Sequence, residues 1–144
     1  MKHLFEKLQH HFPQSAIDKV EHIEANSHIV TIKNITLLDP SGNGQWLDGS
    51  VPQQTMIDAH IQSCVMYLLN ENYLEDHRYQ LAKIQSFDAI KEAFPGDQLR
   101  IESEFKSSKN NLISFESRSY INGSQSSEMT LQIRQTNPST SSTF

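Results

Sequence analysis

The sequence predicts an α+β domain in which an antiparallel sheet wraps around a single long helix. One segment, residues 52–70, carries hydrophobic residues at helical spacing. One strand-like segment precedes it and four follow it, with only short turn-forming stretches between the last four. Runs of strands joined by tight turns favour antiparallel pairing, and a lone amphipathic helix must bury its apolar side against the sheet.

The N-terminal third predicts a short helix, then a strand, then a loop. Residues 2–10 form a short amphipathic stretch that should end near Pro13. Residues 28–36 are dense in β-branched side chains, which favour a strand. The run 39–44, Asp-Pro-Ser-Gly-Asn-Gly, gathers residues that interrupt regular structure and predicts a loop.

The long helix is predicted from a continuous apolar stripe. The stripe consists of Ile57, Ile61, Cys64, Val65 and Leu68. Successive members are three or four positions apart, except for the neighbours Cys64 and Val65. This spacing places them on one side of a helix, which should face the sheet. Cys64 lies within the stripe and is expected to be a small core residue.

Four strands are predicted in the second half, over residues 80–87, 98–106, 112–121 and 124–135. Asn122-Gly123 separates the last two and predicts a two-residue type I′ hairpin, because both central residues of that turn need positive φ. Residues 136–144 are rich in Ser, Thr and Pro and are expected to form a flexible tail. We therefore expect one domain over residues 1–135.

Composition limits the functions that the chain could have. It has 144 residues, 36% of them hydrophobic and 20% charged, with a net charge of −5 and one cysteine, Cys64. The scattered Lys and Arg residues argue against binding to nucleic acid or to an anionic membrane. A single cysteine cannot form an intrachain disulfide. The N-terminus is too polar for a signal peptide, and no apolar run is long enough to span a membrane. A cytoplasmic protein is expected.

Three groups of residues resemble the β-hydroxyacyl-acyl-carrier-protein dehydratases. The first is His11-Phe12-Pro13 with Asp18-Lys19-Val20, followed by 32–36 and Asn43-Gly44; the second is Phe94-Pro95-Gly96-Asp97-Gln98-Leu99; the third is Pro52 with Asp58-Ala59 and Gln62. Their order and spacing cover about residues 10–135. The resemblance implies the hot-dog fold, an antiparallel sheet wrapped around one central helix.

The sequence departs from this family where the catalytic residues are expected. The resemblance implies a His after Asn-Gly, which removes a proton α to the thioester carbonyl, but this chain has Gln45. Imidazole titrates near neutral pH, whereas a carboxamide does not titrate. Thirteen positions separate Gln45 from Asp58, one fewer than the family pattern implies. The site is therefore expected to be inactive or weakly active.

The remaining site residues follow from the same resemblance. Asp58 corresponds to the helix carboxylic acid that helps to expel the β-hydroxyl, although a hydrogen-bonded side chain at the helix edge is an alternative explanation. Gln53 replaces a glycine whose backbone N–H would bind the thioester carbonyl. The acyl chain is expected to run past Met56 and Ile57. Two further substrate contacts are expected, from Trp46 and Gln62.

Three functions remain open from the sequence. The first is a non-catalytic or weak dehydratase relative that binds acyl thioesters, carried by acyl carrier protein or coenzyme A. The second is a dehydratase that uses another base, with His60, His28 and His22 as candidates. The third is a hot-dog thioesterase that uses Asp58. We expect a homodimer or a mixed dimer with another hot-dog protein, with no cofactor and no metal ion.

Overall fold

The computed structural model describes residues 2–36 and 50–136. They form a short helix α1 (Lys2–Gln9), a long helix α2 (Gln53–Glu71) and a six-stranded antiparallel sheet. The strands are β1 (Lys19–Glu24), β2 (His28–Asn34), β3 (Arg78–Ala89), β4 (Gln98–Lys109), β5 (Leu112–Ile121) and β6 (Ser124–Thr136). Their order across the sheet is β1-β2-β4-β5-β6-β3.

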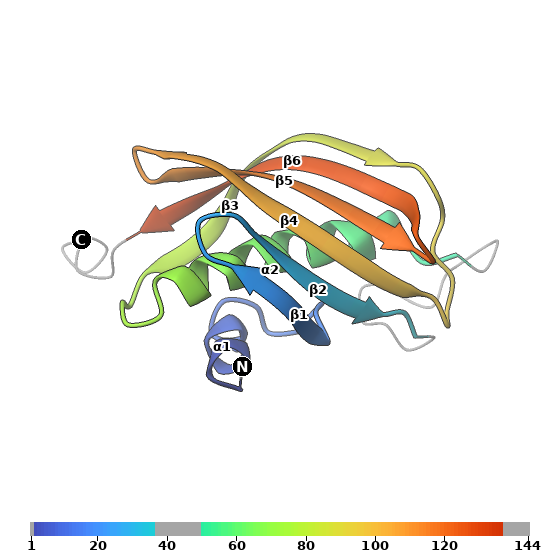
Figure 1. The fold of residues 1–144 in the computed structure, drawn as a ribbon, viewed down its shortest axis with the longest axis horizontal. Helices are drawn as coiled ribbons and strands as arrows, with labels where there is room; N and C mark the ends of the chain where they lie inside the picture. Colours follow the sequence, from blue (N-terminus) through green and yellow to red (C-terminus); the bar gives the residue numbers. More distant parts are fainter. Residues whose placement is uncertain (1, 37–49, 137–144) are drawn as a thin grey trace.

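The sheet curves around α2, which lies along its inner face (Figure 1). Strand β5 shows why: its residues alternate between partly exposed and buried over the whole strand. This period of two directs one set of side chains towards α2 and the other towards solvent. The expected α+β class and the sheet wrapped around one long helix are therefore confirmed.

Helix α2 is buried on more sides than the predicted apolar stripe allows for. Thirteen of its residues are buried, including Met56, His60 and Tyr67, which lie outside the stripe. The stripe accounts for only part of this burial, because α1 also packs against this helix and Gln62 holds the segment before β1 against it. The exposed or partly exposed positions are at the two ends of the helix.

The two hairpin turns among β4, β5 and β6 use asparagine and glycine at positive φ. Asn122 has φ 50° and Gly123 has φ 82°, as the predicted type I′ turn requires. Asn110 (φ 54°) and Asn111 (φ 64°) make a similar reversal between β4 and β5. Asparagine tolerates the left-handed region better than most other non-glycine residues, so both connections can be short.

One strand was not predicted, and several boundaries differ from the prediction. Strand β1 pairs with β2 through a turn in which Asn26 has φ 61°. Its six residues are charged or only partly buried, so no clear hydrophobic alternation marked it. Strand β3 begins at Arg78 and ends at Ala89, and β6 includes Thr136. The predicted loop 39–44 and residues 137–144 of the predicted tail lie outside the described residues.

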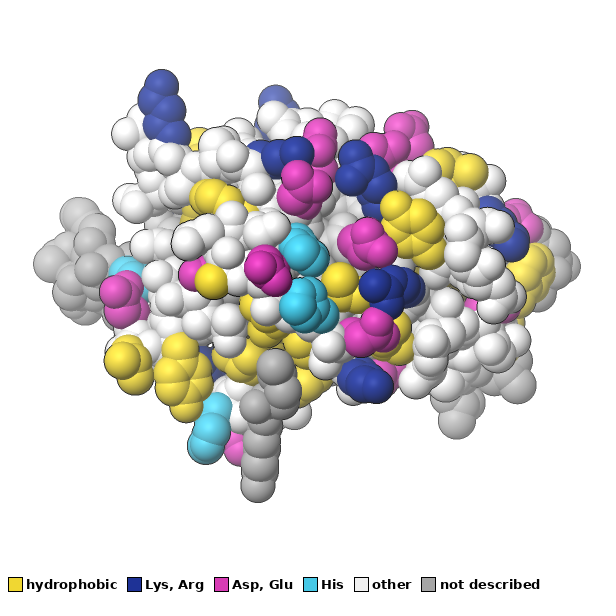
Figure 2. All heavy atoms as spheres, in the orientation of Figure 1, with side chains coloured by type: hydrophobic (Ala, Val, Ile, Leu, Met, Phe, Trp, Pro, Cys, Tyr) yellow, Lys and Arg dark blue, Asp and Glu magenta, His cyan; other side chains and the backbone are white. Residues whose placement is uncertain are grey.

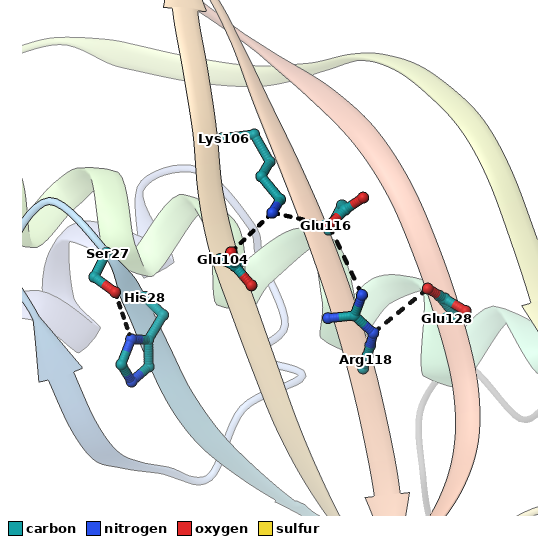
Figure 3. A network of polar contacts seen from close by, with 7 residues as sticks. All are labelled: Ser27, His28, Glu104, Lys106, Glu116, Arg118 and Glu128. Atoms are coloured by element: carbon teal, nitrogen blue, oxygen red, sulfur yellow. Dashed lines mark hydrogen bonds and ion pairs between the residues drawn. The ribbon is translucent and has the colours of Figure 1, made fainter.

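The outer face of the sheet carries charges of both signs. Figure 2 shows acidic and basic side chains interspersed over this face. Lys106 bridges Glu104 and Glu116, and Arg118 links Glu116 to Glu128, so ion pairs cross β4, β5 and β6 (Figure 3). Such a mixed face offers no continuous basic surface for a phosphate backbone. None of the described helices has the length and apolar character needed to cross a membrane.

Candidate functional site

A cavity of about 330 Å³ lies at the first turn of α2. Two segments line it, and the lining residues are Ser50, Val51, Pro52, Gln53, Met56, Ala89, Ile90, Lys91 and Glu92. Pro52 is the N-cap of α2 and supplies no side-chain hydrogen bond to the helix. The first backbone N–H groups of a helix lack the usual acceptor four residues before them, and they carry the positive end of its dipole. In α2 the Thr55 N–H donates to the Pro52 carbonyl at 3.0 Å, so the groups that face the cavity are those before Thr55. This end of the cavity therefore favours a carbonyl or anionic oxygen.

Backbone hydrogen bonds hold the two lining segments together. The Val51 N–H donates to the Ala93 carbonyl at 2.7 Å, which ties the start of α2 to the chain after β3. The N–H groups of Ile90 and Lys91 both donate to the Ser126 carbonyl, at 2.8 and 3.0 Å. The cavity walls are therefore fixed to strand β6 and to each other.

Asp58 lies one turn further along α2, on the open side of the helix. Gln54 donates from Nε2 to the Asp58 carboxylate Oδ1 at 2.8 Å. Asp58 and its neighbour Ile57 are both partly exposed, while the helix residues that follow are mostly buried. A hydrogen-bonded carboxylate at the helix edge fits both interpretations of Asp58, as a catalytic acid and as an ordinary polar contact. Asp58 is not among the residues that line the cavity.

The other predicted site residues divide into three groups. Gln53 and Met56 line the cavity, whereas Ile57 packs against the larger apolar cluster of the core. Gln45 and Trp46 lie outside the described residues. The substrate-binding roles of Gln53, Met56, Ile57 and Trp46, and the assignment of Gln45 to the catalytic position, stay predictions.

Gln62 has a structural function that the sequence did not reveal. Its side chain is buried, with 4% exposed. Its Oε1 accepts a hydrogen bond from the Ala16 N–H at 2.7 Å, and its Nε2 donates to the Gln14 carbonyl at 3.0 Å. Both ends of the amide are therefore occupied by the backbone that precedes β1. A substrate contact by Gln62 stays a prediction.

His60 is buried and hydrogen-bonded at both ring nitrogens. Nδ1 lies 2.6 Å from the Ser117 hydroxyl, and Nε2 lies 2.8 Å from the Ser127 hydroxyl. Burial lowers the pKa of His60 to about 3. The side chain is fully enclosed, so His60 is a packed core histidine and not a base near neutral pH. Cys64 is also fully buried, as expected, and burial raises the pKa of its thiol to about 12.

The other two candidate bases lie on the sheet and not at the cavity. His28 contacts Ser27 through Nδ1 at 2.8 Å, beside the ion pairs of the outer face (Figure 3). His22 contacts Glu24 and lies against the His28 ring. No histidine is among the described residues that line the cavity. Over residues 2–36 and 50–136, no cluster of three or more His, Cys, Asp or Glu side chains could hold a metal ion.

Lys91 and Glu92 are cavity residues that the sequence did not single out. They lie between the predicted strand and Phe94-Pro95-Gly96-Asp97, in a stretch without a periodic pattern. Asp97 closes that turn, because its carboxylate accepts the Phe94 N–H at 2.8 Å, and Gly96 has φ 98°. Asp97 therefore has a structural role in this turn. The turn brings Lys91 and Glu92 back towards the start of α2.

Comparison with solved structures shows the hot-dog fold. The dehydratase heterocomplex ApeI:P from Xenorhabdus doucetiae matches with a TM-score of 0.77 at 18% identity, covering 94% of this chain and 92% of that chain. A hypothetical thioesterase with coenzyme A from Streptococcus pneumoniae matches with a TM-score of 0.68 at 12% identity, covering 83% and 88%. At these identities the likeness establishes the fold alone.

Sequence comparison establishes the family. No protein-family model matches the chain. The 3-hydroxyacyl-acyl-carrier-protein dehydratase FabZ of Ralstonia nicotianae is 29% identical over 119 residues, covering 80% of this chain and 73% of the relative. The FabZ dehydratase of Clostridium perfringens is 34% identical over 100 residues, covering 69% of this chain and 71% of the relative. The chain therefore belongs to the FabZ family of 3-hydroxyacyl-acyl-carrier-protein dehydratases.

Proposed function

We propose that this protein binds an acyl thioester at the start of α2 and does not dehydrate it efficiently by itself. The observation that carries the proposal is Gln45, which stands where the resemblance implies the catalytic His. Removal of a proton α to a thioester carbonyl needs a base that titrates near neutral pH. A carboxamide holds a substrate by hydrogen bonds but cannot take up that proton.

The geometry around the cavity supports the loss of the base. The described lining residues contain no histidine. His60, the histidine on α2, has both ring nitrogens in hydrogen bonds inside the core. Asp58 remains on α2 and could still act as an acid, but an acid alone does not remove the α proton. Binding is therefore retained while the proton abstraction is lost.

The cavity offers complementary contacts for a thioester. The N–H groups at the start of α2 suit the carbonyl oxygen, and Met56 provides an apolar wall. Lys91 on the opposite wall suits a phosphate of the carrier, which acyl carrier protein and coenzyme A both supply through their pantetheine arm. The acyl thioester of either carrier is therefore the proposed ligand.

The exposed edge of the sheet supports assembly with a second hot-dog chain. Strand β3 is at one edge of the sheet, and most of its residues are exposed. Two of them, Leu81 (38%) and Ile84 (37%), are large hydrophobic side chains. An exposed, apolar edge strand pairs readily with another strand. We propose a homodimer, or a mixed dimer in which an active homologue supplies the missing histidine.

One assay distinguishes the proposed function from its alternatives. Purified protein is given 3-hydroxyacyl thioesters of acyl carrier protein and of coenzyme A, and free thiol and enoyl absorbance are followed together. We expect binding by calorimetry with little of either product. Enoyl product at a rate typical of an active dehydratase would show that another base is used. Rapid release of free thiol would instead identify a thioesterase.

A further inference from the structure

Buried polar side chains form a belt across the inner face of the sheet. The polar belt consists of His60 on α2, Ser103 on β4, Ser117 and Ser119 on β5, and Ser126 and Ser127 on β6. His60 contacts Ser117 and Ser127, Ser103 contacts Ser117 at 2.8 Å, and Ser119 contacts both Ser126 and Ser127. Every member is at most 1% exposed. The belt is therefore a continuous hydrogen-bonded network inside the core.

The polar belt divides the core into two apolar clusters. The cluster on the cavity side includes Met56, Leu99, Ile101 and Ile121. The larger cluster lies on the other side and includes Phe115. Along β4, Ser103 follows Ile101, and along β5, Ser117 and Ser119 separate Phe115 from Ile121. A hydrocarbon chain that passed from one cluster to the other would have to cross this network.

The polar belt adjoins residues that line the cavity, although none of its own members is a lining residue. Met56 lines the cavity, and His60 follows it by four positions on the same side of α2. Ala89 on the opposite wall is the register partner of Ser127. The adjacent wall residues Ile90 and Lys91 donate to the Ser126 carbonyl. Successive turns of a helix are about 5.4 Å apart, so the belt is about one turn beyond Met56.

A β-bulge makes this arrangement possible. The register of β5 and β6 shifts between Ser119 and Tyr120, so Ser126 is an additional residue on β6. Consecutive strand residues normally point to opposite faces, yet Ser126 and Ser127 both bond to Ser119 inside the core. The bulge therefore directs the hydroxyl groups of both Ser126 and Ser127 into the core, next to Ser119.

We propose that the polar belt closes the inner end of the acyl pocket and restricts this protein to short acyl chains. The inference rests on the proposed binding of acyl thioesters at the start of α2. An acyl chain that enters past Met56 reaches His60 within about one helix turn. A longer chain would have to separate His60 from its serine partners, and buried polar groups left without partners are costly. His60 is thus a specificity-determining residue at the closed end of the pocket.

A second route along α2 would give the opposite specificity. A chain that follows the open side of the helix, past the partly exposed Ile57, would avoid the polar belt. Long chains would then bind at least as well as short ones, because each added methylene buries more apolar surface. Chain-length preference therefore distinguishes the two routes.

The test measures binding of butyryl-, octanoyl- and dodecanoyl-coenzyme A by calorimetry, below the concentration at which they form micelles. For the wild type we expect butyryl-coenzyme A to bind at least about tenfold more tightly than dodecanoyl-coenzyme A. This is the ratio of dissociation constants expected if the longer chain breaks one buried hydrogen bond of the polar belt. His60→Ala should open the end of the pocket and move the optimum to octanoyl. His60→Asn, with a smaller polar side chain, should give a smaller shift in the same direction.

Met66→Ala is the matched control. Met66 is a fully buried α2 residue in the other apolar cluster, so its truncation also leaves a core cavity but away from the belt. We expect its chain-length profile to equal that of the wild type. An equal shift in Met66→Ala and His60→Ala would overturn the assignment to His60. Equal binding of all three thioesters to the wild type would overturn the inference and leave the proposed function intact. Binding of none would overturn both.

Discussion

The His60 imidazole and the Ser117 hydroxyl lie 2.6 Å apart inside the core, and they fix the position of α2 against strand β5. His60 contacts Ser127 on β6 through its other nitrogen. A neutral imidazole donates from one nitrogen and accepts at the other, so one serine must donate and the other must accept. A protonated imidazole would have two donors and no acceptor. Protonation would therefore make both serines acceptors, and it would leave a charge in the core.

The first prediction is that acid destabilises the protein through His60. Burial lowers the folded-state pKa from 6.5 to about 3, so the unfolded state binds the proton first as the pH falls. The contribution of neutral His60 to the free energy of unfolding is fully present above about pH 6.5, and it is lost progressively as the pH falls towards 3. At one pKa unit per 1.36 kcal/mol, the loss is about 2 kcal/mol by pH 5. Urea unfolding at a series of pH values measures it.

His60→Asn provides the control for this prediction, because asparagine can hydrogen-bond to serine but does not titrate. Its stability should be lower than that of the wild type at pH 7, and it should fall less steeply between pH 6.5 and pH 4. Other groups contribute to the acid sensitivity, including His11, whose pKa is also lowered chiefly by burial. The difference between the two slopes isolates His60. Parallel slopes in the two proteins would contradict the prediction.

The second prediction concerns the Gln62 amide, which holds the backbone at Gln14 and Ala16. Gln62→Leu keeps a similar size but leaves the part-buried Ala16 N–H and Gln14 carbonyl without their partner. We expect unfolding to become easier by about 1–3 kcal/mol. Gln62→Glu should retain the bond from the Ala16 N–H and lose the one to the Gln14 carbonyl. Chemical denaturation measures both variants, and a Gln62→Leu protein as stable as the wild type would refute the structural role.

The strands from β3 to β6 could be predicted from sequence because the residue types within each strand and turn are enough to indicate them. The hairpin at Asn122 and Gly123 needs positive φ, and this need is visible in the residue types alone. Strand β1 was missed because it is an edge strand whose side chains are mostly exposed. Its position depends on pairing with β2, and tertiary pairing leaves little mark on the sequence of a solvated strand.

The polar belt could not be predicted from local patterns. The inward-facing residues of β4, β5 and β6 are mostly apolar, and they are interrupted by Ser103, Ser117 and Ser127. In the sequence, such an interruption indicates only a strand with a weak hydrophobic pattern. Only the sheet register and the position of α2 bring them to His60. The resemblance pointed to Gln53 and Met56, which line the cavity, and their contacts with substrate stay predictions. The sequence could not identify Lys91, whose place at the cavity depends on the turn after β3.

The third prediction tests the turn at Gly123. Its φ of 82° lies in the left-handed region, and a Cβ added there would have no atom within 4 Å. The cost of Gly123→Ala is therefore backbone strain and not a steric clash, and we expect about 1–2 kcal/mol of destabilisation by thermal or urea unfolding. Asn122→Gly, at φ 50°, should be nearly neutral. Equal losses in the two variants would show that strain at Gly123 is not the cause.

The fourth prediction is that strand β3 forms a dimer interface. Light scattering of the wild type at micromolar concentration should give the mass of a dimer, either of this chain alone or with a hot-dog partner expressed alongside it. Ile84→Lys places a charge on the exposed edge strand and should weaken the dimer, because an unpaired charge is costly in an apolar interface. Leu74→Lys is the control, since Leu74 is 93% exposed and lies outside β3. A wild type that stays monomeric alone and with its partner would contradict the prediction.

The last prediction restores the base that the sequence lacks. If Gln45 is the reason for low activity, Gln45→His should raise dehydration of a 3-hydroxyacyl thioester, because positioned general bases contribute about 10²–10⁴-fold. A loop shorter by one residue could misplace the imidazole, and a shift of about 1 Å can itself cost on the order of 10²-fold. A second variant therefore adds one residue between positions 47 and 50. Asp58→Asn should abolish any activity gained in either variant. If the wild type already dehydrates at a rate typical of the family, and Asp58→Asn leaves that rate unchanged, the reaction does not depend on these two positions.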